Sequence, residues 1–178
     1  MPLNMSNQPE LEIPFESTRA LLTKWMARDP GKTAIVDLDQ NEKSITWGQL
    51  ASEADKVAQY LSDNGVKPGE KVAVLAEENI EKLIVWMGIW RFGAAICPLN
   101  VEMNEVHLVE ILEGIEPALT LWHHELDGPR LTAGLTTPVA KFGNWKSGNG
   151  DASDAGELFT LLAGYPDRAG ADIDSENS

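Results

Sequence analysis

Hydrophobic positions in the middle of the chain follow two alternating patterns. Apolar residues recur at helical spacing in three segments, 50–61, 80–90 and 106–115. Short continuous apolar runs lie at 72–75, 94–97 and 118–122. Such runs are typical of strands that are covered on both faces. Strand and helix patterns joined by short connections predict an α/β fold, with a parallel sheet between layers of helices.

Polar residues and glycines at the segment ends support these boundaries. Thr46 and Gln49 form a capping box, in which the hydroxyl accepts from the Gln49 amide and the glutamine side chain reaches back. Gly93 provides a left-handed end for a helix whose apolar residues lie almost all round, which predicts deep burial. Because Pro98 cannot donate to a strand ladder, we expect the preceding buried strand to end at Cys97.

The two flanks of this unit carry weaker patterns. Four further elements are expected: a helix over 17–27, a hairpin of strands at 33–38 and 44–46, a strand at 138–142, and a helical stretch at 157–163. Composition divides the chain into a loose N-terminus at 1–14, a domain at 15–142, and a linker with an acidic, disordered tail at 143–178.

Composition narrows the classes of function. The chain has 178 residues and a formal net charge of −14, from 28 acidic and 14 basic residues. Excess negative charge argues against binding to nucleic acid or to an anionic membrane surface. The single cysteine, Cys97, excludes an internal disulfide. No apolar run is long enough to cross a bilayer, and we see no secretion signal, so we expect a cytoplasmic protein without membrane insertion.

One polar cluster invites a metal hypothesis. His123, His124 and Glu125 carry imidazole and carboxylate groups, which both ligate metal ions. Adjacent strand residues point to opposite faces, so the histidines cannot chelate as a unit, and we interpret them as polar residues at a strand end. His107, in the first turn of a helix, is expected to be a solvated surface residue.

Cys97 and two tryptophans are interpreted as structural residues. Cys97 lies in an apolar strand with no His or basic neighbour in sequence, which predicts a buried, inert thiol and not a nucleophile. Trp86 and Trp90 are four residues apart on the most apolar helix. We expect them to be core residues and not a stacking platform.

Two glycine-containing stretches are candidates for binding phosphate. Gly143, Gly148 and Gly150 are followed by acidic residues in place of a lysine, which would repel phosphate. The stretch 132–141 is rich in threonine and ends at Lys141. It has one glycine where such a loop needs more, because amides approach a phosphate closely only without Cβ atoms in the way. No catalytic, cofactor-binding or metal-binding residue is therefore nominated.

With these residues in view, the chain resembles the N-terminal part of the AMP-forming adenylating enzymes, which include acyl-CoA synthetases, related ligases and luciferases. Four motifs carry the resemblance in order: 29–36 (DPGKTAIV), 45–50 (ITWGQL), 65–73 (GVKPGEKVA) and 93–100 (GAAICPLN). The last is close to the family's Gly-Ala-x-x-x-Pro-Leu-Asn, and residues 105–121 fit the helix and strand that come next. The resemblance extends over residues 15–125.

The resemblance implies a two-step reaction. A carboxylate attacks ATP to give an acyl-adenylate and pyrophosphate, and the thiol of CoA then displaces AMP; ATP, Mg and CoA are thus implied for the complete family member. The family's nucleotide-binding loop, adenine-binding motif, ribose-binding aspartate and catalytic lysine are not recognisable here. The stretch 132–141 departs from that loop because Leu135 interrupts it and its lysine is displaced by one position. We expect a chain truncated before the nucleotide-binding loop.

Three hypotheses follow from the sequence. The first is the N-terminal fragment of an acid–CoA ligase, structural in role and inactive alone, with the missing remainder of a split ligase as its partner. The second is a free-standing α/β module that binds a small molecule or a protein without catalysis. The third is an inactive chain that regulates a full-length ligase.

Overall fold

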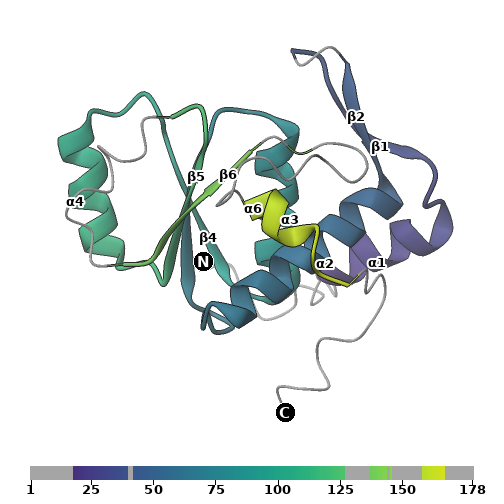
Figure 1. Ribbon diagram of the computed structural model, residues 1–178, viewed down its shortest axis with the longest axis horizontal. Helices are drawn as coiled ribbons and strands as arrows, with labels where there is room; N and C mark the ends of the chain where they lie inside the picture. The colour runs from purple at the N-terminus through teal and green to yellow at the C-terminus, as the bar shows by residue number, and fades with distance from the viewer. Residues whose placement is uncertain (1–17, 40–41, 127–136, 144, 146–157, 167–178) are drawn as a thin grey trace, which may run out of the picture.

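The computed structural model describes residues 18–39, 42–126, 137–143, 145 and 158–166 (Figure 1). The helices are α1 (Thr18–Arg28), α2 (Trp47–Asp63), α3 (Ile80–Phe92), α4 (Glu105–Ile115) and α6 (Leu158–Leu162). The strands are β1 (Thr33–Asp37), β2 (Lys43–Thr46), β3 (Lys71–Leu75), β4 (Ala95–Leu99), β5 (Leu119–His123) and β6 (Val139–Phe142). The predicted loose N-terminus, residues 132–136 of the threonine-rich stretch, linker residues 146–157 and the tail from residue 167 lie outside the described residues.

Four parallel strands form the central sheet in the order β4-β3-β5-β6, which confirms the predicted α/β class. The chain leaves β3 through α3 to reach β4 on one side, then returns through α4 to β5 on the other side of β3. Figure 1 shows α2 and α3 on one side of this sheet and α4 on the opposite side. Right-handed crossovers that run in opposite directions produce this two-sided arrangement.

The predicted hairpin is also present, as an antiparallel pair of strands β1 and β2 that projects from the body of the molecule in Figure 1. It leads directly into α2 through the predicted capping box. Thr46 Oγ1 accepts from Gln49 N at 3.3 Å, and Gln49 Oε1 accepts from Thr46 N at 3.0 Å. Two amides of a helix start thereby gain partners, which fixes where the hairpin ends and α2 begins.

Strand β4 does not end before Pro98 as predicted, but continues to Leu99 with Pro98 in register with Val74 of β3. The reason is the position of β4 at the edge of the sheet. Ala95 N donates to Glu70 O at 2.8 Å, toward the β3 side. Because strand residues alternate in direction, the nitrogen of Pro98 faces the open edge, where no ladder hydrogen bond is lost.

The main core lies between the sheet and the helices α2 and α3. Deep burial of α3 is confirmed for most of its length, and its Gly88 lies against Val57 of α2. Trp145 and the apolar face of α6 complete this core, since Trp145 is 4% exposed and Leu158 and Leu162 are buried. On the other side of the sheet, α4 buries Leu108 and Leu112. No helix among the described residues is long and apolar enough to cross a membrane.

Candidate functional site

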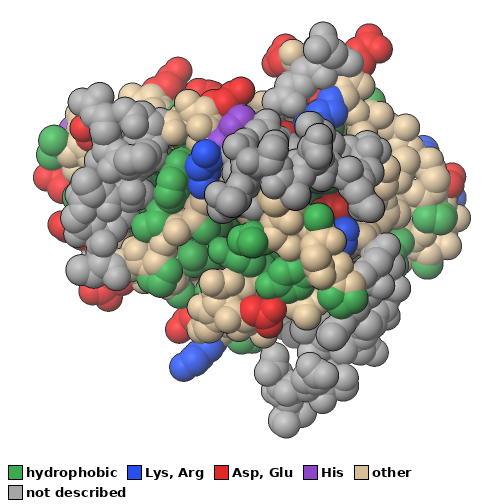
Figure 2. Space-filling model, viewed as in Figure 1, with side chains coloured by type: hydrophobic (Ala, Val, Ile, Leu, Met, Phe, Trp, Pro, Cys, Tyr) green, Lys and Arg blue, Asp and Glu red, His purple; other side chains and the backbone are tan. Residues whose placement is uncertain are grey.

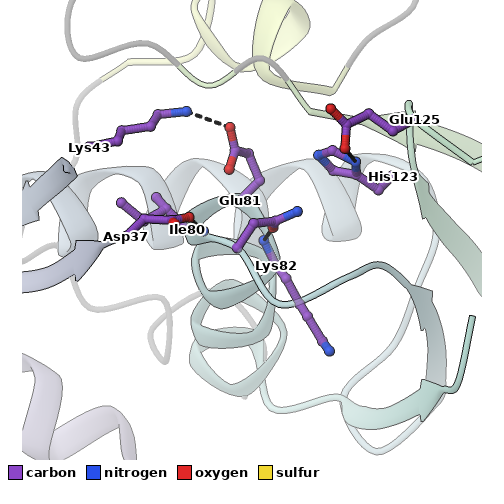
Figure 3. Close-up of polar contacts among 8 residues, drawn as sticks. Asp37, Lys43, Ile80, Glu81, Lys82, His123 and Glu125 are labelled. Carbon is purple, nitrogen blue, oxygen red and sulfur yellow. Dashed lines mark hydrogen bonds and ion pairs between the residues drawn. The ribbon is translucent and has the colours of Figure 1, made fainter. Parts of the chain in front are cut away.

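The carboxyl ends of β3 and β5 lie side by side at the centre of the sheet, and the chain leaves them in opposite directions. Ligands of open α/β sheets bind in the crevice outside the strand ends at such a switch point. Glu81 lies in the first turn of α3, which follows β3, while His123 ends β5 and Glu125 follows it. Figure 3 shows these three side chains together, with Lys43 of β2 reaching Glu81. We call this cluster of Lys43, Glu81, His123 and Glu125 the crevice, after its position outside the strand ends.

The N-terminus of α3 begins at the crevice, and side chains accept hydrogen bonds from two of its amide groups. Asn79 Oδ1 accepts from Lys82 N at 2.8 Å, and Asp37 Oδ2 accepts from Ile80 N at 3.3 Å. Open amides and the positive end of the helix dipole are what bind a phosphate. Here the Asp37 carboxylate takes that place, and Glu81 adds a second carboxylate in the first turn. The first turn of α3 is therefore poorly suited to bind a phosphate.

Glu81 is a buried carboxylate, with 2% of its surface exposed. Its Oε1 accepts from Lys43 Nζ at 2.5 Å, while its Oε2 has no hydrogen-bond partner in the described part of the chain. Lys43 Nζ also lies 5.4 Å from the ring centroid of Trp145, within cation–π range. A buried charge is unfavourable unless it is paired. Lys43 therefore holds the hairpin, the start of α3 and the segment after β6 together.

His123 is also buried, with 2% of its surface exposed, and its Nδ1 lies 3.7 Å from Glu125 Oε2. Its ring centroid is 4.5 Å from that of His124, so the prediction that the two imidazoles point to opposite faces was wrong. The reason is that β5 ends at His123, so strand alternation no longer fixes His124. Within the described ranges, no group of three or more His, Cys, Asp or Glu side chains could hold a metal ion.

Gly143 has a packing role beside these histidines. A Cβ built on it would lie 2.1 Å from His124 Cδ2, and its φ of +143° is a conformation that side chains rarely allow. His124 N donates to Phe142 O at 2.8 Å, which fixes the backbone at this approach. The glycine thus makes room for an imidazole. Lys141, the end of the threonine-rich stretch, lies inside β6 and is partly buried.

The other singled-out residues lie away from the crevice. His107 is exposed as predicted, with its Nδ1 2.8 Å from Asn104 Nδ2. Cys97 is half-buried, so the prediction of a buried thiol was wrong, because β4 is an edge strand. Trp90 is 39% exposed and Trp86 is partly buried, with ring centroids 6.1 Å apart. The core interpretation was therefore wrong for Trp90, which lies on the flank of α3 that the core does not cover.

Sequence reasoning missed the residues that organise the crevice. The partners Lys43 and Glu81 are 38 positions apart, and Asp37 and Ile80 are 43 apart, so no local spacing connects them. One signal was available, since Glu81 is a lone acidic residue in the first turn of a very apolar helix. Carboxylates are almost never fully buried unless they are paired, so Glu81 required a cation from elsewhere in the chain.

Comparison with known proteins assigns most of the described residues to one protein family. Residues 22–158, which include all the described strands and the crevice, match the family described as AMP-binding enzyme.

Curated relatives match the same region at low coverage of their own length. Bacitracin synthase 3 from Bacillus licheniformis is 30% identical over 121 residues, which are 68% of this chain and 2% of the relative. The PKS-NRPS hybrid synthetase psoA from Aspergillus fumigatus is 29% identical over 131 residues, or 72% of this chain and 3% of the relative. The chain thus spans a small fraction of the length of the curated relatives it matches.

Solved structures share the fold. Apo MatB from Rhodopseudomonas palustris has a TM-score of 0.66 and 25% identity, covering 83% of this chain and 28% of that chain. The nonribosomal peptide synthetase FmoA3, bound to alpha-methyl-L-serine-AMP, has a TM-score of 0.66 and 23% identity, covering 75% of this chain and 14% of that chain. The four-stranded parallel sheet with helices on both sides is the N-terminal subdomain architecture of these adenylate-forming proteins.

Proposed function

The chain belongs to the AMP-binding enzyme family, and we propose that it forms the N-terminal scaffold of an enzyme that activates a carboxylic acid with ATP. In the complete enzyme the carboxylate attacks ATP, and an acyl-adenylate forms as pyrophosphate leaves. The support is the family match over residues 22–158 together with the shared fold of the ATP-bound MatB structure. The proposal includes a cytoplasmic location, where ATP is supplied.

We further propose that a thiol accepts the acyl group in the second step, with the thiol of CoA as the acceptor that the resemblance to acyl-CoA synthetases implies. The matched proteins include the hybrid synthetase psoA and FmoA3 with its bound alpha-methyl-L-serine-AMP, which supports an amino acid as an alternative to a simple carboxylic acid. Product analysis of the complete protein with CoA and with each class of acid would distinguish these substrates.

The role of this chain in the reaction is structural. The observation that carries this conclusion is the α3 N-terminus, where the Asp37 carboxylate occupies the place that a phosphate would take. ATP, Mg and CoA would then be bound by residues outside the described part. Those residues come from the rest of a longer protein or from a partner chain that supplies the remainder of a split ligase. The family-like unit is residues 15–142, and Trp145 and α6 pack against it.

A chimera tests this proposal. In MatB, the segment that matches this chain would be replaced by residues 15–166, and ATP-dependent pyrophosphate release would be measured with the acid that MatB uses. We expect measurable release from the chimera and none from the present chain alone with a panel of carboxylic and amino acids. A folded but inactive chimera contradicts the scaffold role, and turnover by the chain alone contradicts the purely structural role.

A further inference from the structure

Helix α2 ends in a Schellman motif built around the dipeptide Asn64–Gly65. Gly65 has a φ of +78° and is the left-handed residue that such a cap requires. Its N–H donates to Ser62 O at 3.0 Å, and Val66 N donates to Leu61 O at 3.0 Å, which are the two hydrogen bonds of the motif. Val66 and Leu61 both belong to the main core, as the apolar pair of this motif usually does. Backbone hydrogen bonds and apolar burial therefore close the end of α2 together.

The same dipeptide is the one at which asparagine most readily undergoes deamidation. The glycine nitrogen attacks the asparagine Cγ, a succinimide ring forms, and the side-chain amide leaves with the glycine proton as ammonia. One water molecule then opens the ring to give aspartate, or isoaspartate with a main chain one methylene longer. Glycine favours this attack because it has no Cβ to hinder its nitrogen. Asn64 and Gly65 are both exposed, so solvent reaches them.

The closed cap keeps the reacting atoms apart. Asn64 has a ψ of 13°, so the Gly65 nitrogen nearly eclipses the nitrogen of Asn64 and is turned away from its Cβ. Ring closure needs the opposite arrangement, with the Gly65 nitrogen on the side of Cβ. Asn64 Nδ2 donates to Tyr60 O at 2.8 Å, which holds the side chain back along the helix. Since the attacking N–H donates to Ser62 O, both reacting groups are engaged while the cap is closed.

The chain is also held on the far side of the cap. Gly69 N donates to Gly93 O at 2.8 Å, and Lys67 N donates to Glu70 Oε2 at 2.8 Å, which ties the following turn to the end of α3. An isoaspartate in place of Asn64 adds a backbone methylene between this anchor and the helix. Because the Schellman hydrogen bonds span a fixed number of backbone atoms, the longer chain does not fit them.

Helix α6 lies close to the same end of α2. Asp63, which precedes Asn64, forms a hydrogen bond with Tyr165 shortly after α6. Figure 1 shows α6 against α2, and Figure 2 shows hydrophobic side chains gathered on the face that α6 occupies. Either product of deamidation adds a carboxylate beside Asp63, at the negative end of the α2 dipole, where a negative charge is unfavourable. The change therefore affects the docking of α6 as well as the cap.

We propose that Asn64–Gly65 is a latent deamidation site, which the Schellman motif keeps unreactive and which reacts when the last turn of α2 opens. Formation of isoaspartate then prevents the cap from closing again. A transient local opening thereby becomes a permanent change at the end of α2 and in its contact with α6. The proposal is independent of the proposed function of the chain.

A comparison of the full chain with a peptide tests the protection. The 178-residue chain and a synthetic peptide of residues 57–71, the tryptic fragment that contains the site, are incubated together in mildly alkaline buffer. An isolated peptide of this length does not hold a stable helix. Tryptic mapping by mass spectrometry then follows Asn64 separately from the other Asn-Gly dipeptide, Asn149–Gly150. We expect loss of Asn64 to be at least ~tenfold slower in the chain, because the reaction waits for the cap to open.

Matched valine variants locate the opening. Val66→Ala removes two methyl groups from the apolar pair of the cap and should speed the loss of Asn64 by ~threefold or more. Val74→Ala makes the same truncation at a buried position of β3 and should leave the rate within ~twofold of the native chain. Circular dichroism checks that both variants are folded. Equal acceleration by the two variants would show that the site opens only with the whole fold, which contradicts the proposal.

Two further outcomes would also overturn it. One is deamidation of the chain as fast as that of the peptide, which would mean that the cap gives no protection. The other concerns chain aged until Asn64 is converted, in which the amides of Gly65 and Val66 should exchange hydrogen faster than in fresh chain. Unchanged exchange would show that the cap tolerates the product. These two measurements use the native sequence, so they decide the matter even if Val66→Ala does not fold.

Discussion

Gly88 of α3 lies so close to Val57 of α2 that a Cβ atom built on the glycine would be 2.4 Å from the Val57 Cβ. Real side chains do not approach so closely, so the two helices pack at this distance because position 88 has no side chain. A helical glycine ordinarily lowers stability relative to alanine. Here Gly88 permits α2 and α3, the two longest described helices, to come into close contact within the main core.

We predict that Gly88→Ala lowers the free energy of unfolding by about 1–3 kcal/mol, because the methyl group forces the helices apart. Gly114→Ala in α4 is the matched control, since nothing lies within 4 Å of its added Cβ. That change should be neutral or raise stability by up to about 1 kcal/mol. Urea unfolding of both variants measures the difference, and equal values for the two would contradict the close packing.

The buried ion pair between Arg91 and Asp55 gives a second prediction. Arg91 Nε donates to Asp55 Oδ1 at 2.6 Å, and Arg91 Nη1 donates to Thr23 Oγ1 at 2.7 Å, so the pair links α1, α2 and α3. Both charged residues are at least 93% buried. Asp55→Ala should cost about 3–5 kcal/mol, because it leaves a buried guanidinium without its carboxylate.

The control for that pair is the double variant Arg91→Met/Asp55→Leu, which removes both charges and keeps apolar volume. It should cost clearly less than Asp55→Ala alone, since no unpaired charge stays in the core. Urea unfolding measured for the single and double variants yields the comparison. If the double variant loses more stability than Asp55→Ala, the loss in Asp55→Ala comes from the missing ion pair and not from the unpaired guanidinium.

Local sequence patterns were sufficient to predict the helices and strands at the centre of this fold. The capping box at Thr46, the left-handed end at Gly93 and the apolar runs at 72–75 and 118–122 act over a few residues, and the structure has each of them. The error at Pro98 arose because the sequence does not state which strand lies at the sheet edge. That property depends on the strand order β4-β3-β5-β6, which is set by long-range packing.

The crevice could not be predicted in the same way. Asp37 and Lys43 lie on the hairpin and Glu81 lies on α3, and these segments are far apart in sequence and meet where the hairpin packs on α3. The His123–His124 contact was missed because strand alternation was applied one residue beyond the end of β5.

The ion pair between Glu81 and Lys43 holds the hairpin against α3, and this gives a third prediction. Glu81→Gln should lower stability by about 1–2 kcal/mol, less than for a fully buried pair because the Lys43 side chain is 24% exposed. Amides of β2 should exchange hydrogen faster in this variant, as the hairpin opens without the whole core unfolding. Glu110→Gln, at an exposed residue of α4, is the control and should change stability by less than about 0.5 kcal/mol. Unchanged exchange in β2 of Glu81→Gln would contradict the docking role.

The docking of α6 on α2 gives the last prediction, through the alkaline titration of Tyr165. Burial, a hydrogen bond to Asp63 and the charge of Asp63 raise the pKa of Tyr165 to about 12, and burial also raises the pKa of Tyr60. In the unfolded chain both phenols ionise near pH 10. The contribution of the two tyrosines to the free energy of unfolding is therefore fully present below pH 10. It is lost between pH 10 and about 12, because the unfolded state releases its phenol protons first.

Ultraviolet absorbance of tyrosinate measures this titration directly, because the chain has two tyrosines. Tyr165→Phe should leave a single transition from Tyr60. Asp63→Asn should move the Tyr165 transition to lower pH, because the negative charge that opposes phenolate formation is gone while a side-chain acceptor stays. Asp39→Asn, an exposed carboxylate on the distant hairpin, should leave both transitions in place. Ionisation of both phenols near pH 10 in the folded chain would show that Tyr165 is not held against Asp63, and that α6 is not docked on the end of α2.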